Sequence, residues 1–233
     1  LEEGRAAEVT AQALNEFTLK SYQALKDHPV NKRRAEEGKP PANIILSRGA
    51  GTLPKLTPLP ERYHIKVGAI AVVALVRGIC RTVGMELIDV EGATGGLDTN
   101  YMAKGGAAVK ALEKYDLVIL HVKATDVAGH DGNFEAKRDA IEHIDEMVGY
   151  IMDRVNRDGV YIALTADHTT PISYRDHTGE PVAFLLSGPE TFPSGVAKFS
   201  EREARRGNAS RIRGMNLMNM LMNYMGRAEK FGF

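Results

Sequence analysis

Apolar and amphipathic segments alternate along most of this chain. Short apolar runs predict strands at residues 43–47, 65–73, 86–90, 116–122, 159–165 and 182–187. Apolar residues at helical spacing predict helices at residues 1–26, 74–83, 101–115, 133–156 and 214–225. Strands that alternate with helices are typical of a mostly parallel sheet covered by helices on both faces, so we expect an α/β fold.

Prolines and glycines divide this pattern near residue 56. Residues 31–43 are polar and predict a loop, and the proline-rich stretch Thr52–Arg62 is the best candidate for a domain boundary. The sequence opens at Leu1, without Met, directly in a helical pattern. We interpret this start as a sign that the chain is a piece of a longer protein.

Composition narrows the class of protein. The chain has 233 residues, of which 43% are hydrophobic, and 30 basic residues balance 30 acidic ones. A balanced charge indicates neither nucleic acid nor an anionic membrane as a partner. The single cysteine, Cys80, excludes an internal disulfide and favours a cytoplasmic location. The longest apolar run, Val67 to Val76, is too short to span a membrane, and no secretory signal is visible.

Asp and His side chains gather at three points beside predicted strands. Asp126 and His130 follow the strand at 116–122, Asp167 and His168 follow the strand at 159–165, and His177 precedes the strand at 182–187. A strand, a long helix and a second strand form a right-handed crossover, so we expect the first two strands to be neighbours. All three points would then meet at the carboxyl edge of the sheet, where α/β proteins bind ligands.

These side chains predict a metal site. Carboxylate and imidazole suit zinc, manganese or iron, whereas thiolates are absent. A lone Asp-His pair at a strand end is more often a cap or a loop hydrogen bond, but the joint pattern favours metal. Five ligands exceed one tetrahedral site, so a pair of ions about 3.5–4 Å apart, as in many phosphatases, would fit.

The ordered motifs resemble those of a known family. Asp126-x-x-x-His130, Thr165-Ala166-Asp167-His168 and His177-Thr178 with Pro181-Val182 are similar to the metal motifs of cofactor-independent phosphoglycerate mutases, in the alkaline phosphatase superfamily. Flanking segments over nearly the whole chain resemble the archaeal-type branch: His28-Pro29-Val30-Asn31, Pro41-Ala42-Asn43, Arg48-Gly49-Ala50-Gly51, Gly92-Ala93-Thr94-Gly95, Asp98-Thr99 and Arg211-Ile212-Arg213-Gly214.

The resemblance implies an alkaline-phosphatase-like core and a two-metal site. It assigns Asp126, His130 and His177 to one divalent ion, and Asp167 and His168 to the other. The ions would be Mn²⁺, with Mg²⁺, Co²⁺ or Zn²⁺ as alternatives, and no organic cofactor is implied. The reaction would interconvert 3-phosphoglycerate and 2-phosphoglycerate, in glycolysis and gluconeogenesis, through a phosphoserine.

This chain departs from the family pattern at its start. The family's nucleophilic Ser and an early Asp have no counterpart here, so we expect an incomplete core and no catalytic nucleophile in this chain. Residues 1–56 would be the tail of an inserted substrate-binding domain, and residues 57–233 the C-terminal part of the phosphatase-like domain. The partner would be the N-terminal part of the same protein, and the piece alone should be inactive.

Basic side chains are candidates for binding a phosphorylated substrate. Arg48 lies at a predicted strand end before glycines, where a guanidinium can clamp phosphate or carboxylate at two points. Lys66, Arg77 and Lys104 are weaker candidates for phosphate. Two other functions stay open: a metal-dependent phosphomonoesterase or phosphodiesterase of the same superfamily, and a non-catalytic metal-binding fragment. A nucleotide-binding P-loop is excluded, because Gly92–Gly95 lacks the Lys-Ser/Thr pair.

Overall fold

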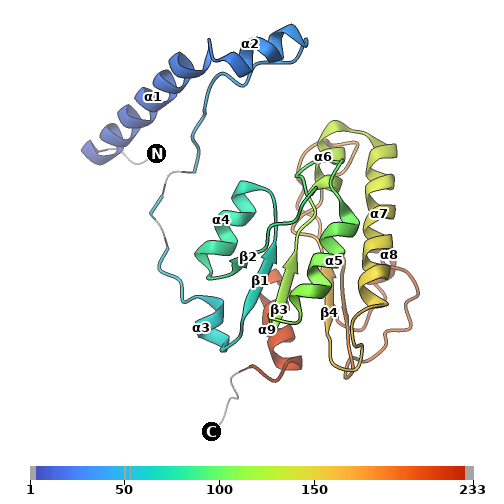
Figure 1. The fold of residues 1–233 in the computed structure, drawn as a ribbon. Helices are drawn as coiled ribbons and strands as arrows, with labels where there is room; N and C mark the ends of the chain where they lie inside the picture. Colours follow the sequence, from blue (N-terminus) through green and yellow to red (C-terminus); the bar gives the residue numbers. More distant parts are fainter. Residues whose placement is uncertain (1–3, 50, 53, 229–233) are drawn as a thin grey trace. The chain divides into compact units, whose positions relative to one another are not determined.

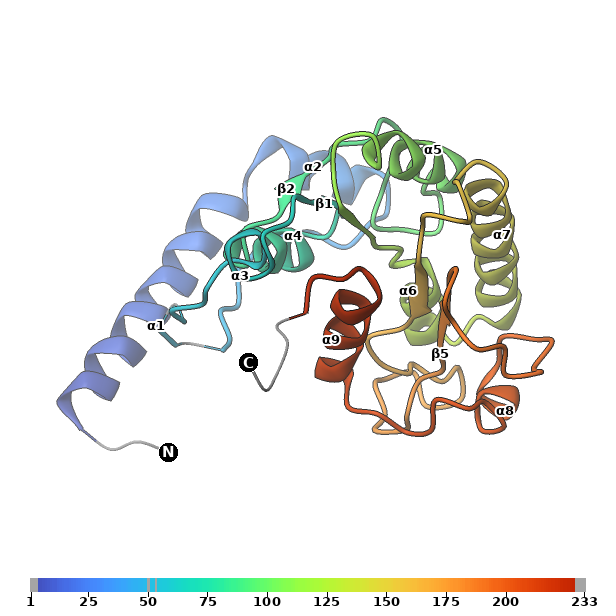
Figure 2. The ribbon, with the colours of Figure 1, turned by 90° about the horizontal axis from the view of Figure 1, so that it is seen from below.

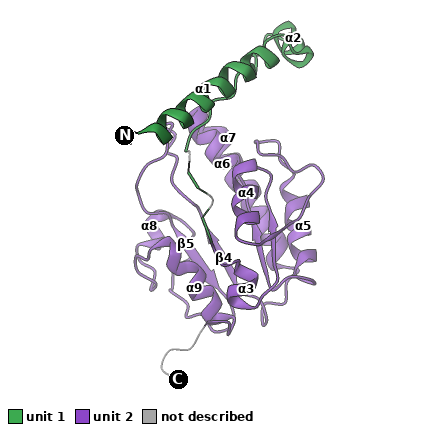
Figure 3. Cartoon of the chain, turned by 90° about the vertical axis from the view of Figure 1, so that its left-hand side faces the viewer, with its two compact units in different colours: residues 1–55 green, residues 56–233 purple. Residues whose placement is uncertain are grey.

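A computed structural model describes residues 4–49, 51–52 and 54–228 (Figure 1). The chain divides into two compact units, Leu1–Lys55 and Leu56–Phe233 (Figure 3). Ala50 of the glycine-containing motif and Leu53 of the proline-rich stretch lie outside the described residues. The assignment of the two parts to domains of a longer enzyme stays a prediction.

The first unit contains two helices. Helix α1, Arg5–Leu25, confirms the helix predicted at the start of the chain. Helix α2, Pro29–Glu36, contradicts the loop predicted from residue 31. The residues at its N-terminus explain why this helix forms. Pro29 occupies the first helical turn, and the His28 ring accepts a hydrogen bond from the backbone N–H of Val30. Polar residues therefore form a helix here without an apolar period.

The strand predicted at residues 43–47 is wrong. These residues form no strand in the structure, and Ile44, Ile45 and Leu46 are exposed. The backbone N–H of Ile45 donates to the hydroxyl of Ser21 instead, at 3.0 Å. An apolar run becomes a strand only when another strand pairs with it, and none of the described residues does so here.

The second unit contains two small sheets. Strands β1 (Val67–Ile70), β2 (Glu86–Leu87) and β3 (Leu117–Leu120) are parallel in the order β2-β1-β3. Strands β4 (Ile162–Thr165) and β5 (Phe184–Ser187) form an antiparallel pair. The mostly parallel α/β fold is confirmed, but the expectation that β3 and β4 are paired neighbours is wrong within the described residues, because each belongs to its own sheet.

Helices surround these strands (Figures 1 and 2). The predicted helices form close to their expected bounds, and α3, α6 and α8 are additional. The helices of the second unit are α3 (Leu59–Tyr63), α4 (Ala74–Thr82), α5 (Tyr101–Ala111), α6 (Ala124–Asp131), α7 (Phe134–Met152), α8 (Glu201–Ala204) and α9 (Gly214–Tyr224).

Two apolar clusters occupy opposite faces of β3. Leu117 packs against a cluster that includes Val67 and Met222 of α9, whereas Leu120 packs against a cluster formed by α5, α6 and α7. Residues three apart on a strand point to opposite faces, so helices cover both faces, as predicted. Met222 is fully buried and Met218 packs against the same cluster, whereas Met215 at the start of α9 is exposed.

The three Asp- and His-containing segments meet, because Thr170 and His177 both contact Asp126. Helix α6 follows the carboxyl end of β3, and the segment from Ala166 follows the carboxyl end of β4. Thr165 at the end of β4 pairs with Phe184 at the start of β5, so the residues before β5 also lie at this edge. No helix in the described part of the chain is long and apolar enough to cross a bilayer.

Candidate metal centre

Helix α6 carries Asp126 and His130 on one face. Four residues is about one helical turn, so the two side chains lie one above the other. On the opposite face, Ala124 and Ala128 are fully buried. At Gly129 a Cβ atom would lie 2.5 Å from the carbonyl oxygen of Thr170, so only glycine lets α6 approach that backbone so closely. Gly129 therefore allows α6 to pack closely against Thr170, in the segment that follows β4.

Two threonines pair across the segment that follows β4 and close it into a loop. Thr169 and Thr178 form an isolated antiparallel bridge, with their hydroxyl oxygens 2.6 Å apart. An antiparallel bridge at this pair places Thr170 opposite His177. Both reach the same atom: the Thr170 hydroxyl donates to Asp126 Oδ1 at 2.7 Å, and His177 Nε2 lies 3.2 Å from it. The Lys137 ammonium also donates to the carbonyl of Thr170, at 2.6 Å, and fixes this residue from α7.

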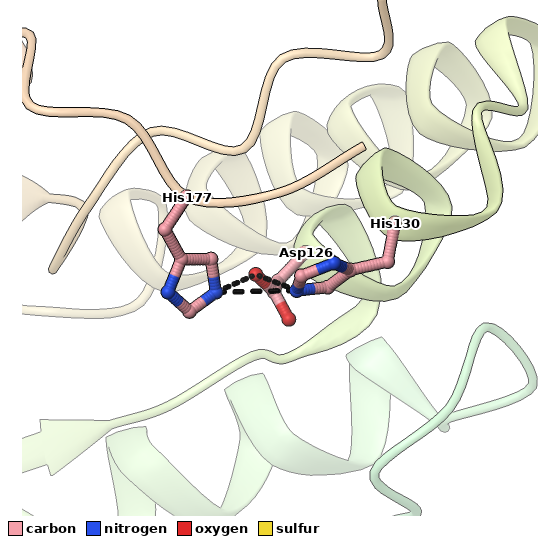
Figure 4. Close-up of side chains that lie close together, drawn as sticks. All are labelled: Asp126, His130 and His177. Carbon is pink, nitrogen blue, oxygen red and sulfur yellow. Dashed lines mark hydrogen bonds and ion pairs between the residues drawn. The ribbon is translucent and has the colours of Figure 1, made fainter. Parts of the chain in front are cut away.

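Asp126, His130 and His177 form a compact ligand triad (Figure 4). Their nearest ligand atoms are 3.2 Å apart for His130 Nε2 and His177 Nε2, 3.2 Å for His177 Nε2 and Asp126 Oδ1, and 3.5 Å for His130 Nε2 and Asp126 Oδ1. Two ligands about 2.1 Å from one tetrahedral ion lie about 3.4 Å apart. The triad therefore has the spacing and the donor atoms that a single divalent ion requires.

The carboxylate of Asp126 is the most enclosed member of the triad. Its side chain is 12% exposed, and Oδ2 accepts no hydrogen bond of good geometry from any described residue, although the Lys123 ammonium pairs with it. Burial by itself would raise the pKa of this carboxyl, but the Lys123 ammonium and the Thr170 hydroxyl outweigh that effect and lower the pKa to about 2. The carboxylate is therefore ionised at neutral pH, as a metal ligand must be.

The ring of His130 is oriented by a backbone carbonyl. His130 Nδ1 lies 3.0 Å from the oxygen of Arg175, which can only accept, so Nδ1 carries the proton. The neutral ring then offers a lone pair at Nε2, toward Asp126 and His177. Metal-binding histidines are commonly held in this way by a carbonyl behind the ring. Arg175 adopts a left-handed backbone conformation, with φ of 58°, in the loop that supplies this carbonyl.

Asp167 and His168 extend the triad into a larger Asp–His cluster of five side chains. His168 Nε2 lies 3.4 Å from Asp167 Oδ2 and 3.9 Å from Asp126 Oδ1. The rings of His168 and His177 are tilted by 31° to one another, with centroids 3.6 Å apart. Asp167 is 74% exposed. The fold thus brings all five predicted ligands together, and their division between two ions stays a prediction.

Two of the predicted substrate-binding cations already have partners. Arg77 Nη1 donates to Asp89 Oδ1 at 2.7 Å and to the carbonyl of Ala71 at 3.0 Å, and it lines a cavity of about 100 Å³. Lys104 is 1% exposed, and its ammonium lies 3.4 Å from the carbonyl oxygens of Thr94 and His121. Burial lowers the pKa of Lys104. Neither side chain is presented to solvent as a free phosphate ligand.

The other two predicted cations are exposed. Lys66 directly precedes β1, at the amino edge of the parallel sheet, whereas the Asp–His cluster lies at the carboxyl edge. This geometry does not favour a substrate contact for Lys66. Arg48 belongs to the first unit and is exposed. Its role in substrate binding stays a prediction.

Sequence patterns did not single out two residues that contact Asp126. Lys123 and Thr170 both pair with its carboxylate. Lys123 stands three residues before Asp126, a spacing that brings side chains together once α6 forms, so a local signal existed. Thr170 is 44 residues away in sequence. Tertiary contacts with α6 and α7, together with the Thr169–Thr178 bridge, bring it to the cluster.

Comparison with known protein families gives a match over most of the chain. Residues 8–224 match the family described as the metalloenzyme superfamily. The chain is 49% identical, over 227 residues, to the 2,3-bisphosphoglycerate-independent phosphoglycerate mutase of Ignicoccus hospitalis, with 97% of this chain and 54% of that protein covered. It is 46% identical over 233 residues to the protein of the same name from Saccharolobus solfataricus, with 100% of this chain and 56% of that protein covered. The chain therefore spans about half the length of these relatives.

Solved structures show the same likeness. The PH0037 protein of Pyrococcus horikoshii has a TM-score of 0.86 and 44% identity, with 98% of this chain and 60% of that chain covered. The cofactor-independent phosphoglycerate mutase of Thermoplasma acidophilum has a TM-score of 0.60 and 29% identity, with 94% of this chain and 53% of that chain covered. The resemblance inferred from the sequence motifs is confirmed.

Proposed function

This chain belongs to the metalloenzyme superfamily, and from that membership we propose that it supplies the metal-binding part of a cofactor-independent phosphoglycerate mutase. The ligand triad is the observation that carries the proposal, because its three ligand atoms already have the spacing that one divalent ion requires. The relatives that span the chain are named as mutases, which favours this function over a hydrolase or a non-catalytic fragment. The rest of the enzyme would be the sequence that the relatives have and this chain does not span.

Two divalent ions are part of the proposal. Asp126, His130 and His177 would hold one ion, Asp167 and His168 would contribute to the other, and Mn²⁺ is the metal we propose for both. Bound ions would supply positive charge and Lewis acidity for moving a phosphoryl group between the 3- and 2-oxygens of glycerate.

The contributions of this chain's own residues follow from their contacts. Asp126 remains ionised because Lys123 and Thr170 lower its pKa to about 2. The Arg175 carbonyl orients His130, and the Thr169–Thr178 bridge holds Thr170 and His177 against Asp126. These contacts preorganise the ligands before any ion binds, which reduces the entropy lost on binding. The proposed substrate is a small phosphorylated acid, and the proposed location is the cytoplasm.

Titration of the chelator-treated chain with Mn²⁺ tests the metal centre. We expect binding at neutral pH and its loss in a His130→Ala, His177→Ala double variant. A His28→Ala, His64→Ala double variant is the matched control, because it removes two exposed histidines that lie outside the Asp–His cluster. Binding that is absent, or equal in both double variants, would contradict the proposed centre.

A coupled enolase assay tests the reaction. The complete protein that contains these residues should convert 3-phosphoglycerate, and its Asp126→Ala variant should not. The 233-residue chain alone should give no turnover above background, because no residue in it matches the nucleophilic serine of the family. Robust turnover by the chain alone would contradict the proposed division of the catalytic groups.

A further inference from the structure

Lys123 directly precedes α6, and none of the predicted metal or substrate positions includes it. Its ammonium pairs with Asp126 Oδ2 across an i to i+3 spacing. The Lys123 side chain is 31% exposed, whereas the carboxylate that it contacts is 12% exposed. The ammonium therefore lies at the boundary between the enclosed carboxylate and solvent.

The position of this ammonium conflicts with a bound ion. Asp126 Oδ2 is buried and receives no hydrogen bond of good geometry from the described residues, and the Lys123 ammonium is the charged group that pairs with it directly. A divalent ion at the ligand triad would lie within a few ångströms of the same carboxylate. Two positive charges so close repel each other, and the repulsion is stronger in a partly buried site than in water.

We propose that Lys123 is an exchangeable counter-ion of the metal centre. Its ammonium neutralises Asp126 while no ion is bound, gives way to a divalent ion, and then binds a phosphate group beside that ion. Lysine suits this role because its ammonium is a compact charge on a flexible four-carbon stem. The inference rests on the proposed metal centre, and it adds a residue that links ion binding to phosphate binding.

The first test measures Mn²⁺ affinity by calorimetry on the chelator-treated chain and on its Lys123→Met variant. Because methionine removes the competing charge, we expect the variant to bind Mn²⁺ roughly tenfold more tightly. Lys114→Met is the matched control, because Lys114 also forms an ion pair, with Glu86, but lies before β3, at the amino edge of the sheet. Equal or weaker Mn²⁺ binding by Lys123→Met would overturn the exchange.

The second test adds inorganic phosphate to chains saturated with Mn²⁺. Lys123→Met should bind phosphate roughly tenfold more weakly than the unsubstituted chain, and Lys123→Arg should recover most of the affinity because it keeps the charge. Lys114→Met should be unchanged. Phosphate affinity that is independent of the charge at position 123 would overturn the anion-binding step.

The third test needs no metal and separates this inference from the proposed centre. In excess chelator, Lys123→Met should lower the melting temperature by about 2–6 °C, because it leaves a buried carboxylate without its counter-ion. The same substitution in an Asp126→Asn background should have almost no effect. Equal effects in the two backgrounds would overturn the counter-ion role. Absence of Mn²⁺ binding by the unsubstituted chain would instead contradict the proposed centre itself.

Discussion

The Asp–His cluster differs from the four cations expected to bind phosphate in how the fold positions the side chains. The triad atoms lie 3.2–3.5 Å apart and are fixed by contacts from α6, from α7 and from the Thr169–Thr178 bridge. By contrast, Arg77 pairs with Asp89, Lys104 is buried against carbonyls, and Lys66 lies at the other edge of the sheet.

This difference has a physical origin. Metal ligands must converge on one point, so they come from a few motifs at neighbouring strand ends, and each motif is short enough to be recognised in the sequence. Substrate-binding cations can extend from many places because their side chains are long and flexible. A short Asp-His motif at a strand end therefore predicts which side chains converge more specifically than a basic residue in a loop predicts a phosphate contact.

The largest effect is expected when the carboxylate of Asp126 is removed. Asp126 contacts both histidines of the triad, so Asp126→Ala should weaken Mn²⁺ binding roughly 100-fold or more. Calorimetry on the chelator-treated chain measures the loss, and Asp158→Ala, an exposed carboxylate in a turn, provides the control. An Mn²⁺ affinity within a few-fold of that of the unsubstituted chain would show that Asp126 is not a metal ligand.

A smaller effect is expected at Thr170, which supports Asp126 without belonging to the triad. Thr170→Val keeps the shape of the side chain but removes the hydroxyl that donates to Asp126 Oδ1. Mn²⁺ affinity should fall about tenfold, the low end for residues that orient ligands. Thr82→Val is the matched control, because its hydroxyl bonds only to a carbonyl of its own helix. Equal losses in the two variants would contradict a specific role for Thr170.

Lys104 offers a test on the cation side of the comparison. Burial penalises its charged form, so Lys104→Met should raise the free energy of unfolding at pH 7 by about 1 kcal/mol. Because the folded-state pKa is lowered, the penalty is complete below that pKa and is relieved as pH rises from it toward the ordinary value of 10.5. Denaturant unfolding between pH 7 and 10 should therefore show stability rising with pH relative to Lys104→Met. A difference between the two chains that does not change with pH would contradict this account.

The smallest effect is expected at Arg77. Its partner Asp89 is 83% exposed, so loss of the ion pair in Arg77→Ala should change stability by less than about 1 kcal/mol. Mn²⁺ affinity should not change, because no contact joins this side chain to the triad. In the complete enzyme, a rise in the KM for 3-phosphoglycerate would show that Arg77 exchanges Asp89 for substrate. The predicted cations would then include a substrate-binding residue after all.

The parts of the fold that the sequence predicted well are those with a strong local period. Helices α1, α5, α7 and α9 each carry an apolar stripe, and strands β1, β3 and β4 are short apolar runs between loops. Helix α2 was missed because its polar residues are organised by Pro29 and His28 at its start rather than by an apolar face. The false strand at residues 43–47 and the separation of β3 from β4 both concern strand pairing, which depends on distant residues.

The candidate site follows the same rule. Its five predicted ligands were recognisable as motifs, whereas the support from Thr170 depends on a bridge between residues far from α6. Lys123 begins the segment that contains Asp126 and His130, and the sequence alone assigned it no role. Its contact with Asp126 gains meaning only from the burial of that carboxylate.

The Thr169–Thr178 bridge also has a consequence for local motion. It closes a loop of only ten residues and holds Thr170 and His177 at once, so opening it would release both from Asp126 in a single event. The loop is therefore a candidate cooperative local-unfolding unit, whose opening would remove the ligand His177 and the Thr170 support of Asp126 together. An ion that binds the closed form would slow hydrogen exchange at the backbone N–H of Thr178, which donates to the Thr169 carbonyl. The exchange rate of that one amide, next to His177 in the chain, would thus report whether the metal centre is occupied.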